Sequence, residues 1–207
     1  NHGDIGSNAV DLSYQHSTSS TRGATGNTAT AMGYGSTASG SYSTAMGEGS
    51  TASGSRSTAM GKTTIASDFA SVVIGQYNSS GSSVTNSATV FNTANTAFVI
   101  GNGTASNAKS DAFKVMFNGD TTVSNDLTVS GDVVISSDAR LKSNIVSLGS
   151  TLPKLLQIDG KSYEMKGKQK IGVLAQEIKE VFPELVTKDD NEMLAVNYQG
   201  LVPVLIN

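Results

Sequence analysis

Small apolar and polar residues alternate along the first half of the chain in a repeat of seven residues. With the single exception of Asp68, glycine occupies every seventh position of this stretch: Gly26, Gly33, Gly40, Gly47, Gly54, Gly61 and Gly75. Alanine, or valine at the last unit, stands two residues before each of these positions. A coiled coil is excluded because glycine in every heptad, with Ser and Thr between, opposes helix formation. We therefore interpret each unit as a short strand followed by a glycine turn.

The residue after each alanine shows that the full period is fourteen. In one set of units this residue is large and apolar, and in the other it carries a hydroxyl: Met32, Met46, Met60 and Ile74 alternate with Thr25, Ser39, Ser53 and Ser67. The pattern predicts a β-solenoid whose coils each contain two strands and stack at about 4.8 Å per coil. Alanine would fill a thin interior, and the large residues would form an apolar column on one outer face.

An apolar column on an outer face is not expected to stay in water. Packing three chains with these columns on a common axis would bury it, and this predicts a homotrimer with Met32, Met46, Met60 and Ile74 at the interface. A monomeric solenoid with the methionines inside remains the alternative at this point.

The repeat loosens after Gly75 and gives way to alternating strands with Asn-Gly and Ser-Gly-Asp turns. The apolar residues expected to face inward are Phe113, Val115, Phe117, Val123, Leu127, Val129, Val133 and Ile135. Such a core is thin for a free-standing monomer. The segment resembles the trimeric β-prism stalks of phage tail fibres and tailspikes, and a small monomeric sandwich is the alternative.

From about residue 136 the composition becomes that of an ordinary globular domain, with all three prolines and the long aliphatic runs. The pattern predicts a helix over 151–158, strands near 162–165 and 171–174 joined by the basic turn Lys166–Lys170, and a helix over 175–181. A strand near 194–197 and a helix starting at Tyr198 complete a small α+β unit.

Composition and charge exclude several functions. The chain has 207 residues, a net charge of −3, no cysteine and only two histidines, His2 and His16. These features argue against a nucleic-acid footprint, a bound metal or a cofactor, and no apolar run is long enough for a membrane span. The sequences GYGSTA and GEGSTA fit a dinucleotide fingerprint, but that motif needs a following helix and here recurs every fourteen residues. Because the chain begins with Asn, we expect it to be a fragment of a longer protein.

The tandem units S-T-A-M-G and S-T-A-S-G over residues 22–76 resemble the head repeats of trimeric autotransporter adhesins. That resemblance implies a left-handed parallel β-roll that assembles as a trimer. It says almost nothing about a ligand.

The C-terminal part resembles the endosialidase-type intramolecular chaperone of phage tail fibres. The resemblance rests on S-D-A-R-L-K-x-N-I, Y-E-M, I-G-V-L-A-Q-E-I-x-x-V-F-P-E-L-V and V-N-Y-x-x-L-V-P-V-L, in this order. It implies a module that trimerises, folds the preceding fibre and then cuts itself off. The family's module continues into a longer C-terminal helix, so this one is expected to be truncated.

The same resemblance assigns roles to individual residues. Ser137 would be the nucleophile, Lys142 the base and Ser136–Ser137 the bond that is cut, with Asp138 and Arg140 shaping the site. Attack by a serine on its own preceding carbonyl is intramolecular, which gives effective molarities of roughly 10⁵–10⁸ M. A lysine acts as a base only when burial or a nearby cation lowers its pKa. A trimer interface closing around Lys142, with Arg140 adjacent, would supply both.

Together these observations predict a mainly β, homotrimeric fibre with a small α+β chaperone domain. The expected divisions are an irregular first segment (1–21), adhesin-head-like β-roll repeats (22–76), a transition and β-prism-like stalk (77–135) and the chaperone (136–207). The expected location is extracellular, on a cell surface or virion. The expected function is adhesion to a cell-envelope glycan or protein receptor, by a fibre that matures through trimer folding and a single self-cleavage.

Two alternatives stay open. One is a fibre that retains its chaperone uncleaved. The other is a fibre-borne glycan-degrading enzyme, which would need clustered carboxylates, whereas residues 22–110 contain only Glu48 and Asp68 as acids.

Overall fold

The computed structural model describes residues 4–16, 19–189 and 192–206 and divides the chain into two compact units. The first unit runs from Asn1 to Asp132 and the second from Val133 to Asn207. His2 lies outside the described residues. Each unit is described by itself.

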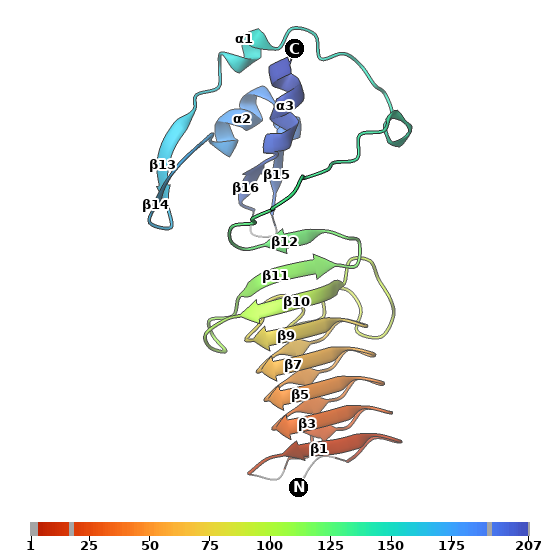
Figure 1. Ribbon diagram of the computed structural model, residues 1–207. Coiled ribbons are helices and arrows are strands. Elements are labelled where there is room, and N and C mark those ends of the chain that lie inside the picture. Colours follow the sequence, from red (N-terminus) through yellow and green to blue (C-terminus); the bar gives the residue numbers. More distant parts are fainter. Residues whose placement is uncertain (1–3, 17–18, 190–191, 207) are drawn as a thin grey trace. The chain divides into compact units, whose positions relative to one another are not determined.

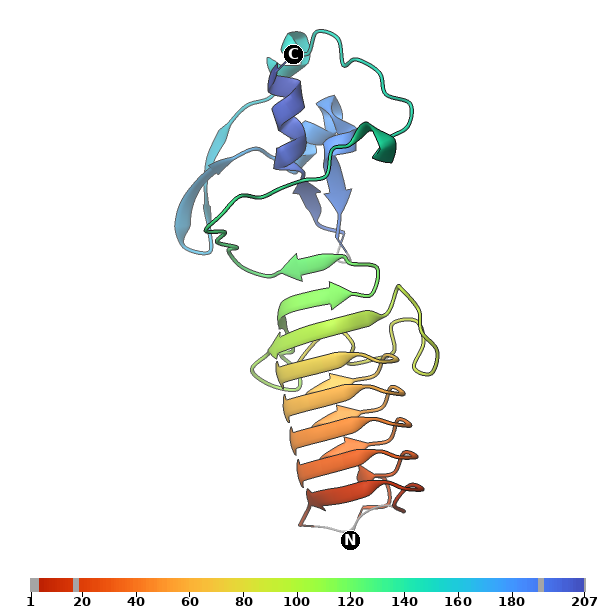
Figure 2. The same ribbon diagram turned by 45° about the vertical axis from the view of Figure 1, so that its right-hand side comes forward.

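The first unit is a β-roll made of two stacked sheets (Figures 1 and 2). In its described part, the larger sheet has eight strands in the order β1-β3-β5-β7-β9-β10-β11-β12. Their bounds are β1 Val10–Tyr14, β3 Thr30–Tyr34, β5 Thr44–Glu48, β7 Thr58–Lys62, β9 Val72–Gln76, β10 Thr96–Asn102, β11 Asp111–Met116 and β12 Thr121–Val123. The smaller sheet consists of the two-residue strands β2 Gly23–Ala24, β4 Thr37–Ala38, β6 Thr51–Ala52 and β8 Ile65–Ala66.

The coils take fourteen residues each and pair in register. Met32 lies opposite Met46, and Met46 lies opposite Met60, in parallel strands. The alanines of both sheets point into the interior and are completely buried: Ala24, Ala31, Ala38, Ala45, Ala52, Ala59 and Ala66. The prediction of an alanine-filled roll with two strands per coil is therefore confirmed.

Strand β1 occupies part of the segment that the sequence analysis expected to be irregular. It pairs in parallel with β3, with Leu12 opposite Met32. The two residues are twenty positions apart in the chain instead of fourteen. A search for a fixed period therefore does not find this coil, although its alternating residues fit the same sheet.

The smaller sheet ends at β8 because a side chain replaces the next strand. In earlier coils the first residue of each short strand donates its backbone N–H to a backbone carbonyl of the next coil. Examples are Thr37 N–H to Ser50 O and Thr51 N–H to Thr64 O, both at 2.8 Å. At Ile65 the acceptor is instead the side-chain oxygen of Asn78 (2.8 Å), whose amide nitrogen donates back to Ile65 O (2.9 Å). The buried Asn78 amide thus satisfies both polar groups of an edge residue.

Asp68 breaks the glycine repeat at the same level of the roll. At Gly26, Gly40 and Gly54 an added Cβ would collide with a backbone carbonyl of the next coil. Asp68 is followed by no such coil, and its buried carboxylate accepts backbone N–H groups from Thr85 (2.6 Å) and Thr96 (2.8 Å). This exception to the repeat anchors the segment 77–95, which connects β9 to β10.

The larger sheet continues beyond the regular coils. Strand β10 pairs in parallel with β9, and β11 and β12 then add to the sheet in antiparallel fashion. The four apolar residues expected to line the rest of a stalk core, Leu127, Val129, Val133 and Ile135, are exposed in the single chain.

The second unit is a small α+β domain. Its elements are the 3₁₀ turn η1 Ala139–Leu141, α1 Leu152–Leu155, β13 Lys161–Met165, β14 Lys168–Gly172, α2 Ala175–Val181, η2 Pro183–Leu185, β15 Val186–Lys188, β16 Leu194–Val196 and α3 Tyr198–Ile206. Its core is formed by Ile178, Phe182, Leu185 and Val204. The buried Thr151 hydroxyl donates to Val204 O at 2.7 Å and ties the start of α1 to α3.

The turn of the β13–β14 hairpin is shorter than the sequence analysis expected. Lys166 and Gly167 both have positive φ, 52° and 73°, the geometry of a two-residue hairpin turn. Lys168–Gly172 therefore belongs to β14 instead of to a basic loop.

Removing the Asp68 carboxylate tests how the roll is terminated. We expect Asp68→Gly, which restores the sequence repeat, to lower the free energy of unfolding by roughly 1–3 kcal/mol, because two backbone N–H groups lose their acceptor. Asp68→Asn keeps one acceptor oxygen, so its free energy of unfolding should lie between those of Asp68→Gly and the wild type. Thermal unfolding measures the effect, with the exposed Glu48→Gln as control. Equal melting of Asp68→Gly and wild type would contradict this role.

Candidate functional site

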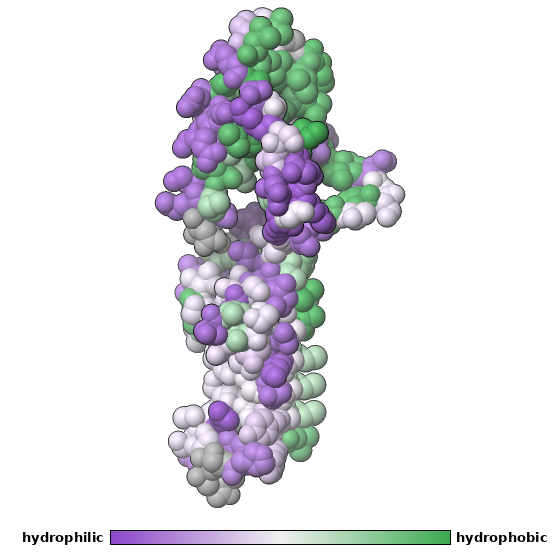
Figure 3. Space-filling model, turned by 90° about the vertical axis from the view of Figure 1, so that its left-hand side faces the viewer, coloured by the Kyte–Doolittle hydropathy of each residue, from purple (hydrophilic) through white to green (hydrophobic). Residues whose placement is uncertain are grey.

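An apolar column runs along the outer face of the larger sheet. The in-register pairs that join the eight strands place these residues in one row: Leu12, Met32, Met46, Met60, Ile74, Ile100, Phe113 and Val123. In the single chain Leu12 is 62% exposed, Met32 37% and Met60 41%. Figure 3 shows the roll from the side, with hydrophobic residues projecting in a row from its right-hand edge.

The methionines therefore point outward as predicted, and the alternative with methionine inside the roll is wrong. The column is also twice as long as the sequence predicted. Leu12 was missed because its coil is out of period, and Ile100 because it follows the loosened repeat, whereas Phe113 and Val123 had been expected as inward-facing residues of the stalk. The alternation with polar neighbours could have found Leu12, and the recurrence of Val-Ile-Gly from residues 73–75 at residues 99–101 could have found Ile100.

The second candidate site is the turn around Ser137. Its Oγ accepts a hydrogen bond from Lys142 Nζ at 2.8 Å. The 3₁₀ turn η1 lies between the two residues and reverses the chain enough for this contact. The structure thus brings together the two residues for which the sequence resemblance implied a nucleophile–base pair.

Asp138 holds this turn. Its side chain accepts from the Arg140 backbone N–H at 2.8 Å, which caps η1. The Arg140 guanidinium also bonds to both carboxylate oxygens, through Nε at 3.0 and 3.2 Å and through Nη2 at 2.7 Å. The side-chain and backbone bonds from Arg140 hold the pKa of Asp138 below its usual range, and the Asp138 carboxylate raises the pKa of Arg140.

This pairing changes the role expected for Arg140. The sequence analysis expected its charge to act beside Lys142, but the guanidinium is bonded to Asp138 and its charge is compensated there. Ser136, Ser137 and Lys142 are all exposed in the single chain. The arrangement has the geometry for proton transfer from Oγ, but it does not exclude water.

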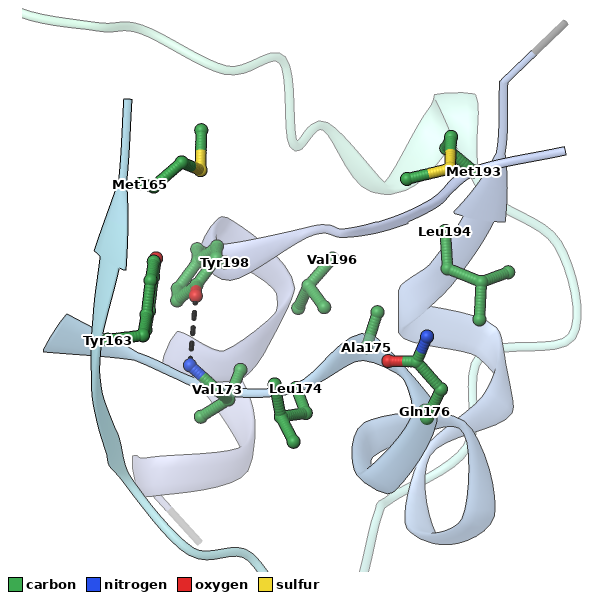
Figure 4. A pocket seen from close by; sticks show the side chains of 10 residues that line it. All are labelled: Tyr163, Met165, Val173, Leu174, Ala175, Gln176, Met193, Leu194, Val196 and Tyr198. Carbon is green, nitrogen blue, oxygen red and sulfur yellow. Dashed lines mark hydrogen bonds between the residues drawn. The ribbon is translucent and has the colours of Figure 1, made fainter. Parts of the chain in front are cut away.

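The second unit also contains an apolar groove that the sequence analysis did not predict. Its volume is about 350 Å³, and it is lined by Tyr163, Met165, Val173, Leu174, Ala175, Gln176, Met193, Leu194, Val196 and Tyr198 (Figure 4). The Tyr198 hydroxyl accepts a bond from Val173 N–H at 3.1 Å. The lining is mostly apolar, with the Gln176 amide and two tyrosine hydroxyls as its polar side-chain groups, so the groove is better suited to packing than to catalysis.

Metal and membrane features were searched in the described residues. Within 4–16, 19–189 and 192–206, no group of three or more His, Cys, Asp or Glu residues could hold a metal ion. Helices of the kind that could cross a membrane are likewise missing from these ranges.

Comparison with known protein families gives two matches. Residues 24–50, 38–64 and 52–78 match the YadA head domain repeat. Residues 137–187 match the family described as chaperone of endosialidase. Neither the curated proteins nor the solved structures contain a match to this chain.

The two matches fall on the two candidate sites. The head repeat covers the coils that carry Met32, Met46, Met60 and Ile74, and the chaperone match begins at Ser137. The chain thus combines a segment similar to the head repeats of trimeric adhesins with a segment similar to the endosialidase-type chaperone, a combination that resembles an adhesin or tail-fibre protein.

Acid titration tests the turn at Asp138. Because the pKa of Asp138 is lowered, the capped turn should persist below the ordinary aspartate range of about 3.9 and be lost only as pH falls through the lowered value. Selective ¹⁵N-arginine labelling gives amide signals from Arg22, Arg56 and Arg140 to follow this. The Arg140 signal should titrate late, and Asp138→Asn should abolish its titration. Titration of the Arg140 amide at the ordinary value would contradict the capped turn.

Proposed function

We propose that this chain forms part of an extracellular homotrimeric fibre whose C-terminal module drives trimer folding and then cuts the chain before Ser137. The observation that carries the proposal is the apolar column of eight residues on an otherwise hydroxyl-rich roll. The Ser137–Lys142 contact supports the second half of the proposal.

The column supports assembly through a common axis. The interior of the roll is filled by alanine, so a single coil buries little apolar area. Burying a large apolar side chain fully stabilises by about 1.5–3 kcal/mol. Three columns meeting along an axis would remove all eight side chains of each chain from water. The column crosses from the parallel coils into β11 and β12, so the same axis serves the roll and the start of the stalk.

The cleavage follows from the turn at Ser137. Neutral Lys142 takes the Oγ proton, and Oγ attacks the carbonyl carbon of Ser136. The carbon–nitrogen bond breaks as the Lys142 ammonium returns the proton to the departing amine, which leaves an ester between Ser136 and Ser137 Oγ. Water hydrolyses this ester to the Ser136 carboxylate and the free Ser137 hydroxyl.

Assembly would gate this reaction. In the single chain Lys142 is exposed to water, and its Nζ donates to Ser137 Oγ at 2.8 Å. Closure of a trimer interface over the turn would remove that water and favour the neutral amine. Arg140 is held by Asp138, so burial is the remaining cause that activates the lysine. Cleavage would then follow assembly.

The roll supports adhesion better than glycan hydrolysis. Asp68 is buried, and both its oxygens accept backbone N–H groups. Glu48 lies 3.9 Å from Lys62 on the outer face. The two acids of residues 22–110 are therefore engaged separately, whereas a glycosidase needs a pair of carboxylates across one bond. We propose a cell-envelope glycan or protein as the receptor.

Met46→Lys tests the axis. Three ammonium groups would meet on the axis, so we expect the trimer to dissociate while each roll stays folded, because the side chain points outward. Mass measurement by light scattering gives the oligomeric state. Ser39→Lys places the same charge on the exposed face of the other strand set and should leave the trimer intact. If the Met46→Lys protein remained a trimer, the proposal that three apolar columns pack along a common axis would be wrong.

Ser137→Ala and Lys142→Met test the cleavage. We expect wild-type trimers to yield a fragment beginning at Ser137, and both variants to remain intact because nucleophile or base is missing. N-terminal sequencing and intact mass detect the cut. Lys154→Met, a lysine elsewhere in the same unit, should cleave normally. A wild-type trimer that stays whole would show that the chaperone is retained uncleaved.

A further inference from the structure

Arg56 is held between two aromatic rings on the surface of the roll. Its guanidinium carbon lies 5.2 Å from the centre of the Tyr42 ring and 5.3 Å from the centre of the Phe69 ring. Both distances are within the range of cation–π contact. In the part of the chain that the structure describes, the guanidinium contacts no carboxylate. Its N–H edge is therefore the part left for a ligand.

The corner geometry of the coils creates this arrangement. One corner residue of each coil has left-handed φ, and these residues lie fourteen apart: Thr28, Tyr42, Arg56 and Ala70. The Arg56 N–H donates to Ser41 O at 2.8 Å and the Ala70 N–H to Ser55 O at 2.9 Å, so the corners stack one coil apart. Tyr42 thus lies one coil before Arg56. Phe69 directly precedes Ala70, the corner residue one coil after Arg56.

The connecting segment 77–95 borders the same corner. Its Ala88 carbonyl accepts from Ser55 N–H at 2.7 Å, and its Ser87 carbonyl accepts from Phe69 N–H at 3.0 Å. This segment is the one that Asp68 anchors. Arg56 therefore lies where the repeat is interrupted by a loop, which is the kind of position that carries binding function on a rigid scaffold.

The chemistry of this corner fits an oxyanion. A guanidinium whose planar faces are held offers its N–H groups as a preorganised fork for a carboxylate or a sulfate. Residues 22–110 contain two acids, and both are engaged elsewhere. Tyr42, 53% exposed, adds an apolar plane beside the fork. The preceding corner positions, Asn27, Ser41 and Ser55, are small and polar and suit a hydroxylated chain.

We propose that Arg56, held by Tyr42 and Phe69, is a binding site for the carboxylate or sulfate groups of an acidic polysaccharide. The inference rests on the proposed adhesive function and names the surface and the class of ligand. A homotrimer carries three such sites, so a repeating polymer gains from multivalent binding.

The test uses the full chain as a purified trimer over immobilised hyaluronate, dextran sulfate and uncharged dextran. We expect binding to at least one acidic polymer, weakening with salt, and none to dextran. The two acidic polymers distinguish a carboxylate from a sulfate ligand. Arg56→Gln should lower affinity by about tenfold or more, and Arg56→Lys should also lose affinity because it keeps the charge without the fork. Arg22→Gln, an exposed arginine on the same roll, is the matched control.

Several outcomes would overturn the inference. These are wild-type affinity in Arg56→Gln, an equal loss in Arg22→Gln, or no binding of the wild type to either acidic polymer. Dissociation of the Arg56→Gln trimer would instead indicate that Arg56 contacts a second copy of the chain, and would also overturn the inference. Trimer mass and the Ser137 fragment are recorded on the same samples. A fibre that assembles and cuts but binds neither polymer refutes this site alone.

Discussion

Contact between alanine side chains in the interior of the roll is the constraint on which the first unit depends. Seven alanines from the two sheets are completely buried, and Val73 and Val99 take the same interior position in β9 and β10, where the regular coils end. Because strand residues alternate between faces, alanine inside forces the next residue outside. The thin interior therefore determines where Met32, Met46 and Met60 lie. An interior of larger residues would have made the coil self-sufficient, and the outer column would then have had no reason to be apolar.

The end of the regular roll depends on two polar side chains that replace backbone. Asn78 bonds to the edge of the smaller sheet as a strand would, and Asp68 binds the segment that leads out of the coils. Only the larger sheet continues, through β10 to β12. The apolar column can therefore extend past the last coil without a break, while the other face changes to loops.

Much of the fold could be predicted from sequence because the repeat is strict. The position of every seventh glycine implied the coils, and the residues between them implied which face each side chain takes. The features that the sequence analysis did not predict do not follow the repeat. Strand β1 lies twenty residues before β3 instead of fourteen. The tight turn at Lys166–Gly167 depends on two positive φ angles, which the lysine-rich sequence does not indicate. The Ser137–Lys142 pair was predicted from a family resemblance, whereas the hydrogen bonds between Arg140 and the Asp138 carboxylate were found only in the structure. The Arg56 sandwich depends on residues from three successive coils, which no local pattern reveals.

The in-register stacking has a further consequence for the length of the molecule. Each coil bonds to the next through the same residue positions, such as Thr44 to Thr58 and Ala45 to Ala59. A duplicated or deleted fourteen-residue unit would therefore leave every remaining bond and both ends of the roll unchanged. The length of the roll can vary in whole steps of about 4.8 Å, each step adding one methionine to the apolar column. Length becomes a property that gene duplication can adjust without redesigning the fold.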